Sequence, residues 1–426
     1  VSKYVDHVYE QSNAHLIQMC KNLKSFCVVV DSWTEHFTGI NYCGIALRFV
    51  DDDYKLWSFI LGCYPYDAPS HSAVHFRTFV DNKLQEYNLQ LDISKFVVSD
   101  NEPKMLAAFR DKCTRIGCSD HYLNKQLQHG FESPTIHVNK NTVEKVNCEA
   151  AQKTFRQVKQ LVTDVRRSHR RQQLSMKLQI YSQTRFSGAM IMLDIFRKVF
   201  YELPLVIINS NLMDIYNSID KLSLDDICQF LGPFDEVINT LSEDKRPSLH
   251  SVIPLRQCLI NMCAIGDDDS TAVAELKVFL AHRIKSAWLI TTEHKLATIL
   301  HPKMKNFENS PDEKDSAISE LKLAFDKELS ISSSSICLLN SNQDMSLSLS
   351  GQNTNGTTLS SKNKSLLTQC FDNVSNVCVK PPNQYQEIDD YLNISDNYNY
   401  VYHENDDIDV LSYWKEKKIN FPHWRL

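Results

Sequence analysis

The chain has 426 residues and a formal net charge of −6 at pH 7, with 42% hydrophobic and 23% charged residues. This length predicts two or three domains, and the ordinary globular composition excludes a collagen and a wholly disordered chain. No stretch approaches the roughly 18 apolar residues of a membrane-spanning helix, so we expect no membrane partner. Because 46 Lys and Arg face 52 Asp and Glu, any contact with nucleic acid must come from a local basic face.

The 13 cysteines are odd in number and follow no repeating pattern. In a chain of this length they are typical of free intracellular thiols rather than of a disulfide scaffold. The first residue is Val rather than Met, which fits a fragment that lacks an N-terminal segment.

The first third of the chain predicts strands alternating with helices. Short apolar and β-branched runs predict four strands, at 26–31, 42–50, 55–64 and 95–99. The short polar connections between the first three predict an antiparallel meander. Helical spacing predicts helices over 71–87 and from 103–109, so the order is strand, strand, strand, helix, strand, helix.

The rest of the chain changes character twice. From about Leu123 it is predicted to be helical, with helix formers over 143–181 and further helices, separated by prolines, up to about residue 329. The Ser- and Asn-rich segment 330–361 cannot bury enough apolar surface and predicts a disordered linker. From residue 384 the chain is acidic and rich in tyrosine.

Two aspartates occupy similar positions. Asp31 ends the first predicted strand and Asp100 follows the fourth. If these strands are neighbours, both carboxylates lie at one sheet edge, where such a pair can hold Mg²⁺ for phosphoryl transfer. The order of elements matches a ribonuclease H-like fold, which uses this placement. The alternative is that both are ordinary turn aspartates.

Six segments together carry a resemblance to a known family. They are VVVDSWTE, VSDNEPKMLAAF, GCSDHYLNKQL, QTRFSGAMIML, LATILHPKMKNF and LSYWKEKKINFP, in this order. The chain resembles the hAT superfamily of transposases (hobo/Activator type) and the host proteins derived from them. The resemblance implies an α/β fold, a ribonuclease H-like mixed sheet interrupted by a large all-α insertion domain.

The resemblance also implies a domain division. Residues 1–187 would hold the first part of the ribonuclease H-like domain with the helices that follow it, and 188–329 the all-α insertion. Residues 330–383 would be the disordered linker. Residues 384–426 would begin a C-terminal dimerisation region, which implies a homodimer for the full-length protein.

The family's functional residues transfer only where the motifs match. Asp31 and Asp100 match the first two acidic residues of the catalytic triad and would be the Mg²⁺ ligands. Cys118 and His121 match a Cys-x-x-His motif. Arg185 matches the Arg of an Arg-Trp motif, and Phe186 replaces its Trp, which is linked to base stacking; a Phe ring also stacks on bases.

The third acidic residue of the triad, a Glu in an Ala/Ser-Glu-Arg-x-Phe-Ser motif, has no match. Glu404 and Glu416 lie near the end of the chain but lack its context. Tyr413-Trp414 matches a family Trp pair that precedes this motif. The resemblance therefore predicts either a C-terminally truncated fragment or a transposase descendant that has lost activity.

Two further clusters contain residue types that can carry chemistry. Cys118 and His121, with Cys113, form too few ligands at recognisable spacing for structural zinc, so zinc is not expected there. The densest positive cluster is predicted to be one helical stripe that contacts DNA phosphates or, alternatively, a solvated helix face; its residues are Arg166, Arg167, Arg170 and Arg171.

Three functions remain open at this stage. The first is a nuclear, non-catalytic regulator of DNA or chromatin, derived from a transposase and acting in transcription. The second is an active Mg²⁺-dependent transposase that cuts and joins DNA, with its third acidic residue beyond this chain. The third is a protein-interaction scaffold that uses the aromatic C-terminal segment. A BED-type zinc finger, common in the family, is not present in this sequence.

Overall fold

The computed structural model describes residues 2–139, 141–208, 211–336, 365–372, 385–394, 400–402 and 407–418. The chain forms two compact units, the first Val1–Ser248 with Leu259–Leu289 and the second Leu249–Cys258 with Ile290–Leu426. This division does not coincide with the boundaries predicted at 187 and 329, which stay predictions. Among the described residues, no helix combines the length and apolar character needed to cross a bilayer.

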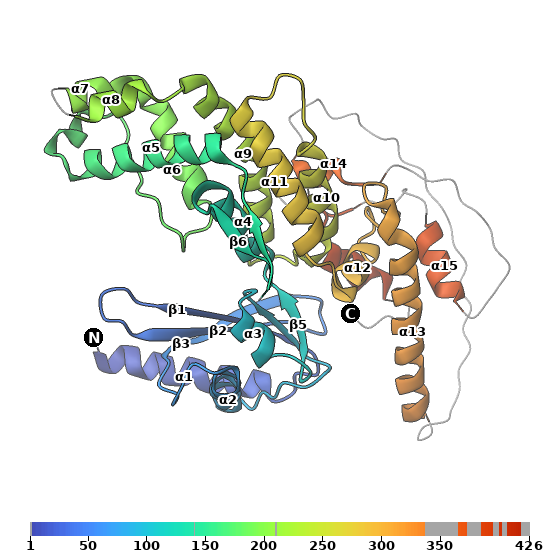
Figure 1. The fold of residues 1–426 in the computed structure, drawn as a ribbon. Helices are drawn as coiled ribbons and strands as arrows, with labels where there is room; N and C mark the ends of the chain where they lie inside the picture. The colour runs from blue at the N-terminus through green and yellow to red at the C-terminus, as the bar shows by residue number, and fades with distance from the viewer. Residues whose placement is uncertain are drawn as a thin grey trace. The chain divides into compact units, whose positions relative to one another are not determined.

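The first unit contains a five-stranded sheet in the order β3-β2-β1-β4-β5 (Figure 1). Its strands are β1 Cys27–Thr34, β2 Asn41–Val50, β3 Leu56–Pro65, β4 Phe96–Ser99 and β5 Thr114–Gly117. The first three form the predicted antiparallel meander, whereas β4 and β5 run parallel to β1. The four predicted strands are confirmed, and β5 was missed because four residues carry little periodicity.

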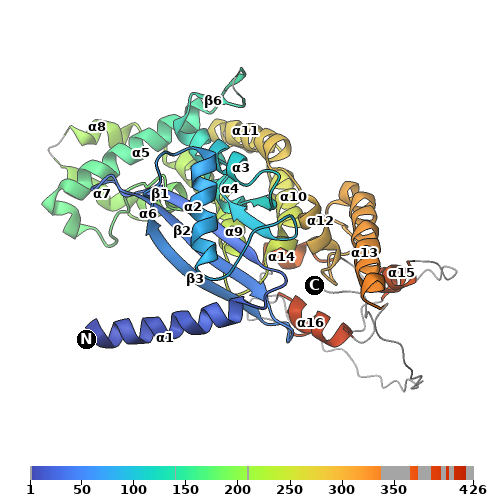
Figure 2. The ribbon, with the colours of Figure 1, turned by 90° about the horizontal axis from the view of Figure 1, so that it is seen from below.

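Helices on one side of the sheet bury its apolar face. They are α2 Ala73–Gln85 and the C-terminal end of α1 Ser2–Cys20, which contributes Leu16, Ile17, Met19 and Cys20 (Figures 1 and 2). Val28, Val30 and Val97 are fully buried by the alternation of their strands. They pack in one core with α2 and with Phe109, which follows α3 Pro103–Ala108. The opposite alternation leaves the residues after Val30 and Ser99 on the other face.

Beyond the sheet the first unit is mostly helical, as predicted from Leu123 onward. Its helices are α4 Ser119–Glu132, α5 Glu149–Arg167, η1 His169–Gln173, α6 Gly188–Lys198, η2 Phe200–Glu202, α7 Leu203–Ile207, α8 Leu212–Asn217, α9 Lys221–Leu241 and α11 Thr271–Ala287. A small antiparallel hairpin, β6 Thr135–His137 with β7 Val143–Lys145, interrupts them. The prediction of helix from residue 143 was therefore wrong for its first residues.

The predicted basic stripe also needs correction. Helix α5 ends at Arg167, and Ser168 adopts an extended conformation with ψ 141°. Arg170 and Arg171 lie in the separate 3-10 helix η1. The four arginines therefore do not form one continuous helical face, and the i,i+4 spacing that predicted the stripe does not apply.

The second unit gathers short helices from distant segments. They are η3 Leu249–Ser251, α12 Thr292–Ile299, η4 Pro311–Glu313, α13 Lys314–Ile336, α14 Leu366–Gln369, α15 Gln386–Asn393 and α16 Val410–Lys417, while α10 Val252–Met262 begins in this unit. Its core holds Tyr391 and Trp414, whose polar atoms donate hydrogen bonds of 2.9 Å to the carbonyls of Ile299 and Leu300. Tyr413, the neighbour of Trp414, is buried as well, so the Tyr413-Trp414 pair identified in the sequence is part of this core.

Two parts of the predicted disordered linker have regular structure. Residues 330–336 continue helix α13, and α14 buries Leu367 beside the buried Cys370. The disordered linker as a whole stays a prediction. The remainder of 330–383 lies outside the described residues, as do Glu404 and the aromatic end at 421–424.

Candidate functional site

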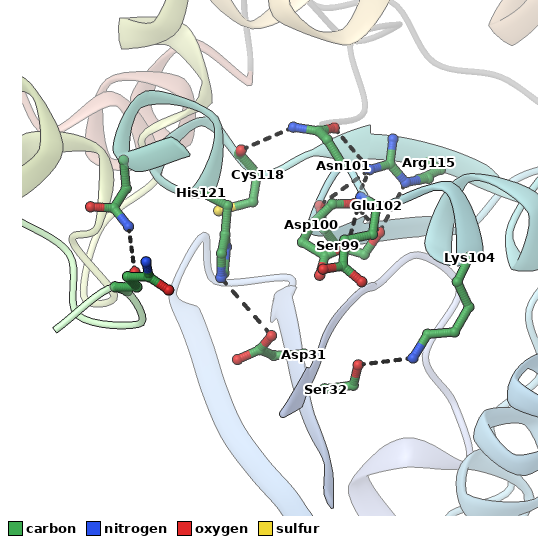
Figure 3. A network of polar contacts seen from close by, with 12 residues as sticks. Asp31, Ser32, Ser99, Asp100, Asn101, Glu102, Lys104, Arg115, Cys118 and His121 are labelled. Atoms are coloured by element: carbon green, nitrogen blue, oxygen red, sulfur yellow. Dashed lines mark hydrogen bonds and ion pairs between the residues drawn. The ribbon is translucent and has the colours of Figure 1, made fainter. Parts of the chain in front are cut away.

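Asp31 and Asp100 come from neighbouring parallel strands. Val30 on β1 is in register with Ser99 on β4, so the residue that follows each is one of the two aspartates. Val30 and Ser99 are buried, and the aspartates after them are half-buried. The two strands are neighbours, which was the condition stated for the aspartate pair. The register of β1 with β4 ends at Val30 and Ser99, and the two aspartates directly follow this last pair (Figure 3).

The sequence predicted that Asp31 ends its strand, and this prediction was wrong. Strand β1 continues to Thr34, and Asp31 stays paired with Gly44 of β2. Its carboxylate therefore lies on a continuous strand, whereas Asp100 follows the last residue of β4. The Asp31 side chain keeps 49% of its surface exposed, so solvent reaches the carboxylate.

Arg115 holds the turn that carries Asp100. Its guanidinium donates to the Ser99 hydroxyl at 2.9 Å, to Asn101 Oδ1 at 3.0 Å and to the Asp100 carbonyl. Asp100 Oδ1 accepts from the Glu102 backbone N–H at 3.0 Å, which fixes one carboxylate oxygen. Figure 3 shows these contacts grouped around the turn.

Gly117 leaves room for the Asn101 side chain beside this network. A Cβ at this position would lie 2.2 Å from Asn101 Oδ1, closer than any real Cβ contact. A larger residue would therefore push Asn101 away from Arg115. The small residue at the end of β5 therefore lets Asn101 keep its contact with Arg115.

The Cys118/His121 motif connects β5 to the two aspartates. The Cys118 backbone N–H donates to the Ser99 carbonyl at 2.8 Å, and Cys118 is the N-cap of α4. One turn into this helix, His121 Nε2 lies 4.0 Å from Asp31 Oδ1. His121 Nδ1 is buried and has no hydrogen-bond partner among the described residues. Burial raises the pKa of the Cys118 thiol to about 11, so the thiol stays protonated at neutral pH.

Phe186 joins the same cluster from far along the chain. Its ring meets the His121 ring edge to face, with 4.9 Å between centroids. The preceding loop is held on α4, because the Gln183 carbonyl accepts from Asn124 Nδ2 at 3.2 Å and from Gln128. Arg185 on this loop is exposed.

The chain then turns sharply into α6. Ser187 has a positive φ of 58°, and a Cβ on Gly188 would lie 2.5 Å from the Ser182 carbonyl. The sequence Ser-Gly therefore suits the turn that presents Phe186 to His121.

Two of the four basic residues of the predicted stripe make local side-chain contacts. Arg170 donates to the Ile208 carbonyl at 3.1 Å, and Arg171 donates to the Arg166 carbonyl at 2.7 Å. Arg167, Arg170 and Arg171 are exposed. None of these contacts joins them to Asp31 or Asp100.

Sequence reasoning missed two residues near the aspartates besides Arg115. Lys104 donates to the Ser32 hydroxyl at 3.2 Å and lies over the Phe76 ring at 4.6 Å. Asp120 is buried next to His121, and burial raises the pKa of its carboxyl to about 7. Lys104 and Asp120 lie inside the matched segments, but nothing in their spacing indicates these surroundings.

Comparison with known proteins gives one relationship. No protein-family model matches the chain. The chain is 23% identical over 276 residues to the Drosophila melanogaster protein "Transposable element Hobo transposase". The match covers 64% of this chain and 40% of that transposase, so it spans less than half of the relative's length. It supports a relationship to hAT-type transposases.

Proposed function

We propose that this chain is a transposase-derived nuclear protein that binds DNA and places a divalent cation between the DNA backbone and the β1–β4 edge of its sheet. One observation carries the proposal: the register of Val30 with Ser99 brings Asp31 and Asp100 to the same edge. The similarity to the Hobo transposase supports DNA as the ligand.

The sheet order supports a ribonuclease H-like domain. Three antiparallel strands followed by two parallel ones, in the order β3-β2-β1-β4-β5, suit a fold that holds acidic residues on its first and fourth strands. The all-α insertion would remain at 188–329, as the resemblance implies, and of its helices α11 packs back on α4 and α5. Homodimerisation remains part of the proposal for the full-length protein.

The residues at this edge fit Mg²⁺. Carboxylate oxygens are the ligands that Mg²⁺ takes in proteins, usually one or two of them with water and phosphate oxygens completing the shell. Asp31 is accessible to solvent, and Asp100 keeps one oxygen free of the Glu102 contact. Bound there, the ion would supply charge neutralisation for a phosphate and, in a two-metal arrangement, activation of an attacking oxygen.

The surrounding side chains suit a nucleic-acid backbone. The Lys104 ammonium and the exposed Arg185 guanidinium would neutralise phosphates on either side of the aspartates. The Phe186 ring, held against His121, offers a face on which a base can stack. Asp31 would orient the His121 imidazole so that Nε2 faces the phosphate side.

A titration of DNA affinity against Mg²⁺ tests the proposal. Mg²⁺ should tighten DNA binding by the wild-type protein, and Asp31→Asn or Asp100→Asn should abolish this gain. Asp52→Asn, in an exposed turn, is the matched control and should keep it. If Mg²⁺ leaves DNA affinity unchanged, or if all three variants respond alike, the cation site is refuted.

Strand cleavage is the second candidate function, favoured by the pairing of the two aspartates on neighbouring strands. A plasmid nicking assay with Mn²⁺ separates it from non-catalytic regulation of transcription. Cleavage that is lost in Asp100→Asn and kept in Asp52→Asn would establish the enzyme. Mg²⁺-assisted binding without cleavage by this chain would favour the regulator.

A further inference from the structure

A second group of possible metal ligands lies in the unit formed by Leu249–Cys258 and Ile290–Leu426. His250, His301 and Asp407 each offer one ligand atom, and these atoms all lie within 4.8 Å of one another. Around a tetrahedral zinc ion with bonds of about 2.0–2.1 Å, neighbouring ligand atoms lie about 3.3 Å apart. The ligand atoms therefore lie at most about 1.5 Å farther apart than they would around a bound zinc ion.

Both imidazoles are buried with unsatisfied nitrogens. His301 is fully buried and His250 is 5% exposed, and their rings stack with 4.6 Å between centroids. The Nε2 atom of each has no hydrogen-bond partner among the described residues. Two such buried atoms carry a desolvation cost that a shared ion would remove. Burial lowers the pKa of both rings, so both are neutral, the form that binds metal.

The three residues come from segments that the surrounding structure holds in place. The carbonyl of His250 accepts from Thr298 Oγ1 at 3.0 Å, and the His301 ring stacks on Phe371 at 5.6 Å. Asp407 Oδ1 accepts from the Ile408 N–H at 2.8 Å, which leaves the second oxygen for another partner. Such backbone contacts orient ligating carboxylates in metal proteins.

We propose that His250, His301 and Asp407 form a zinc site that fastens the segment before α16 to the end of α12 and to η3. Two imidazoles and a carboxylate are ligands that zinc accepts, with water in the fourth position. Coordination through His301 Nε2 places the ring proton on Nδ1, so the 3.2 Å contact that Nδ1 accepts from the Lys303 N–H must open. Zinc binding is thereby coupled to the turn at 301–303.

The test uses the full chain and zinc alone. Metal is stripped with a chelator, and zinc affinity is measured by competition with a chromophoric chelator, with Co²⁺ absorption reporting the ligand geometry. We expect one tight zinc per chain and a tetrahedral Co²⁺ spectrum. His301→Gln and Asp407→Asn should each weaken zinc binding by at least about 100-fold, because each removes a direct ligand.

Two variants locate the site. His294→Gln removes another buried imidazole of the same unit, and Asp31→Asn removes a carboxylate of the sheet edge; both should keep the tight zinc. Circular dichroism checks folding, and Asp407→Asn serves if His301→Gln does not fold. The proposal is overturned if the wild type binds no stoichiometric zinc, or if folded Asp407→Asn binds zinc as tightly as the wild type.

Discussion

Folding has opposite effects at the sheet edge and in the basic segment 166–171. At the sheet edge, residues far apart in sequence converge: Asp31, His121 and Phe186 form a chain of contacts across β1, α4 and the loop before α6. In the basic segment, close neighbours in sequence are separated, because α5 ends before Ser168. Strand pairing fixes position over long distances, whereas a helical stripe depends on where one helix ends.

Among the substitutions that test this comparison, Arg115→Ala should have the largest effect on stability and on cation binding. Its guanidinium donates to Ser99 Oγ, Asn101 Oδ1 and the Asp100 carbonyl, so its loss leaves several acceptors unpaired around the Asp100 turn. We expect the free energy of unfolding to fall by about 2–4 kcal/mol. We also expect Mn²⁺ affinity at the sheet edge to fall about tenfold.

Urea unfolding and Mn²⁺ titration measure these two effects. Arg110→Ala is the control, because Arg110 is exposed, and it should change stability by less than about 0.5 kcal/mol. Equal stability of the two variants would mean that the Asp100 turn holds itself without Arg115.

Asp120→Asn should have the next largest effect, and one that depends on pH. Burial raises the pKa of the Asp120 carboxyl to about 7, above its value of about 3.9 in the unfolded chain. Between these values the folded state holds a proton that the unfolded state has lost, so stability falls as pH rises from about 4 to about 7. The amide cannot ionise, so Asp120→Asn should be more stable than the wild type at pH 8, by about 1–3 kcal/mol.

Denaturant unfolding at pH 5 and pH 8 checks the sign. The gain from Asp120→Asn should shrink at pH 5, where the wild-type carboxyl is protonated in the folded state. Asp52→Asn, at an exposed turn, should show no such difference between the two pH values. A gain of the same size at both pH values would exclude ionisation of Asp120 as its cause.

The sequence was sufficient to predict strands β1 to β4 and to single out the two aspartates as candidates. β-branched runs such as Val28 to Val30 and their polar turns identify strands, whereas the neighbouring of β1 and β4 was only a condition for the aspartate pair, which the register of Val30 with Ser99 meets. Strand β5 and the Arg115 network were not predictable, because Arg115 acts through backbone and amide oxygens that no spacing reveals. The His250, His301 and Asp407 group was missed for a similar reason, since its members are distant in sequence.

Substitutions in the basic segment 166–171 should have a smaller effect than substitutions at the sheet edge. Arg167 and Arg171 are exposed on either side of the break at Ser168. Replacing both by Gln should lower the slope of log affinity against log salt by about 2 and weaken DNA binding about tenfold near 0.1 M salt. Lys21→Gln with Lys24→Gln makes the same change in net charge at exposed positions elsewhere. If the two double variants lose the same affinity, the segment has no DNA contact of its own.

The smallest effect is expected from Ser168→Ala, which addresses the break directly. Ser168 Oγ accepts from the Arg170 N–H at 3.2 Å and so starts η1 in place of another turn of α5. Alanine removes this cap at a cost of about 0.5–1 kcal/mol and favours helix at the same position. With α5 extended, Arg166 and Arg170 would lie one turn apart, as would Arg167 and Arg171.

We expect a small gain in helical circular dichroism at 222 nm and DNA binding that is about twofold tighter, because the charges then line one face. Ser168→Gly is the matched control, since it removes the same hydroxyl but does not favour helix. It should lose the cap without gaining helix or DNA affinity. If the alanine and glycine variants behave alike, the break is set by the contact of Arg170 with the Ile208 carbonyl rather than by the serine cap.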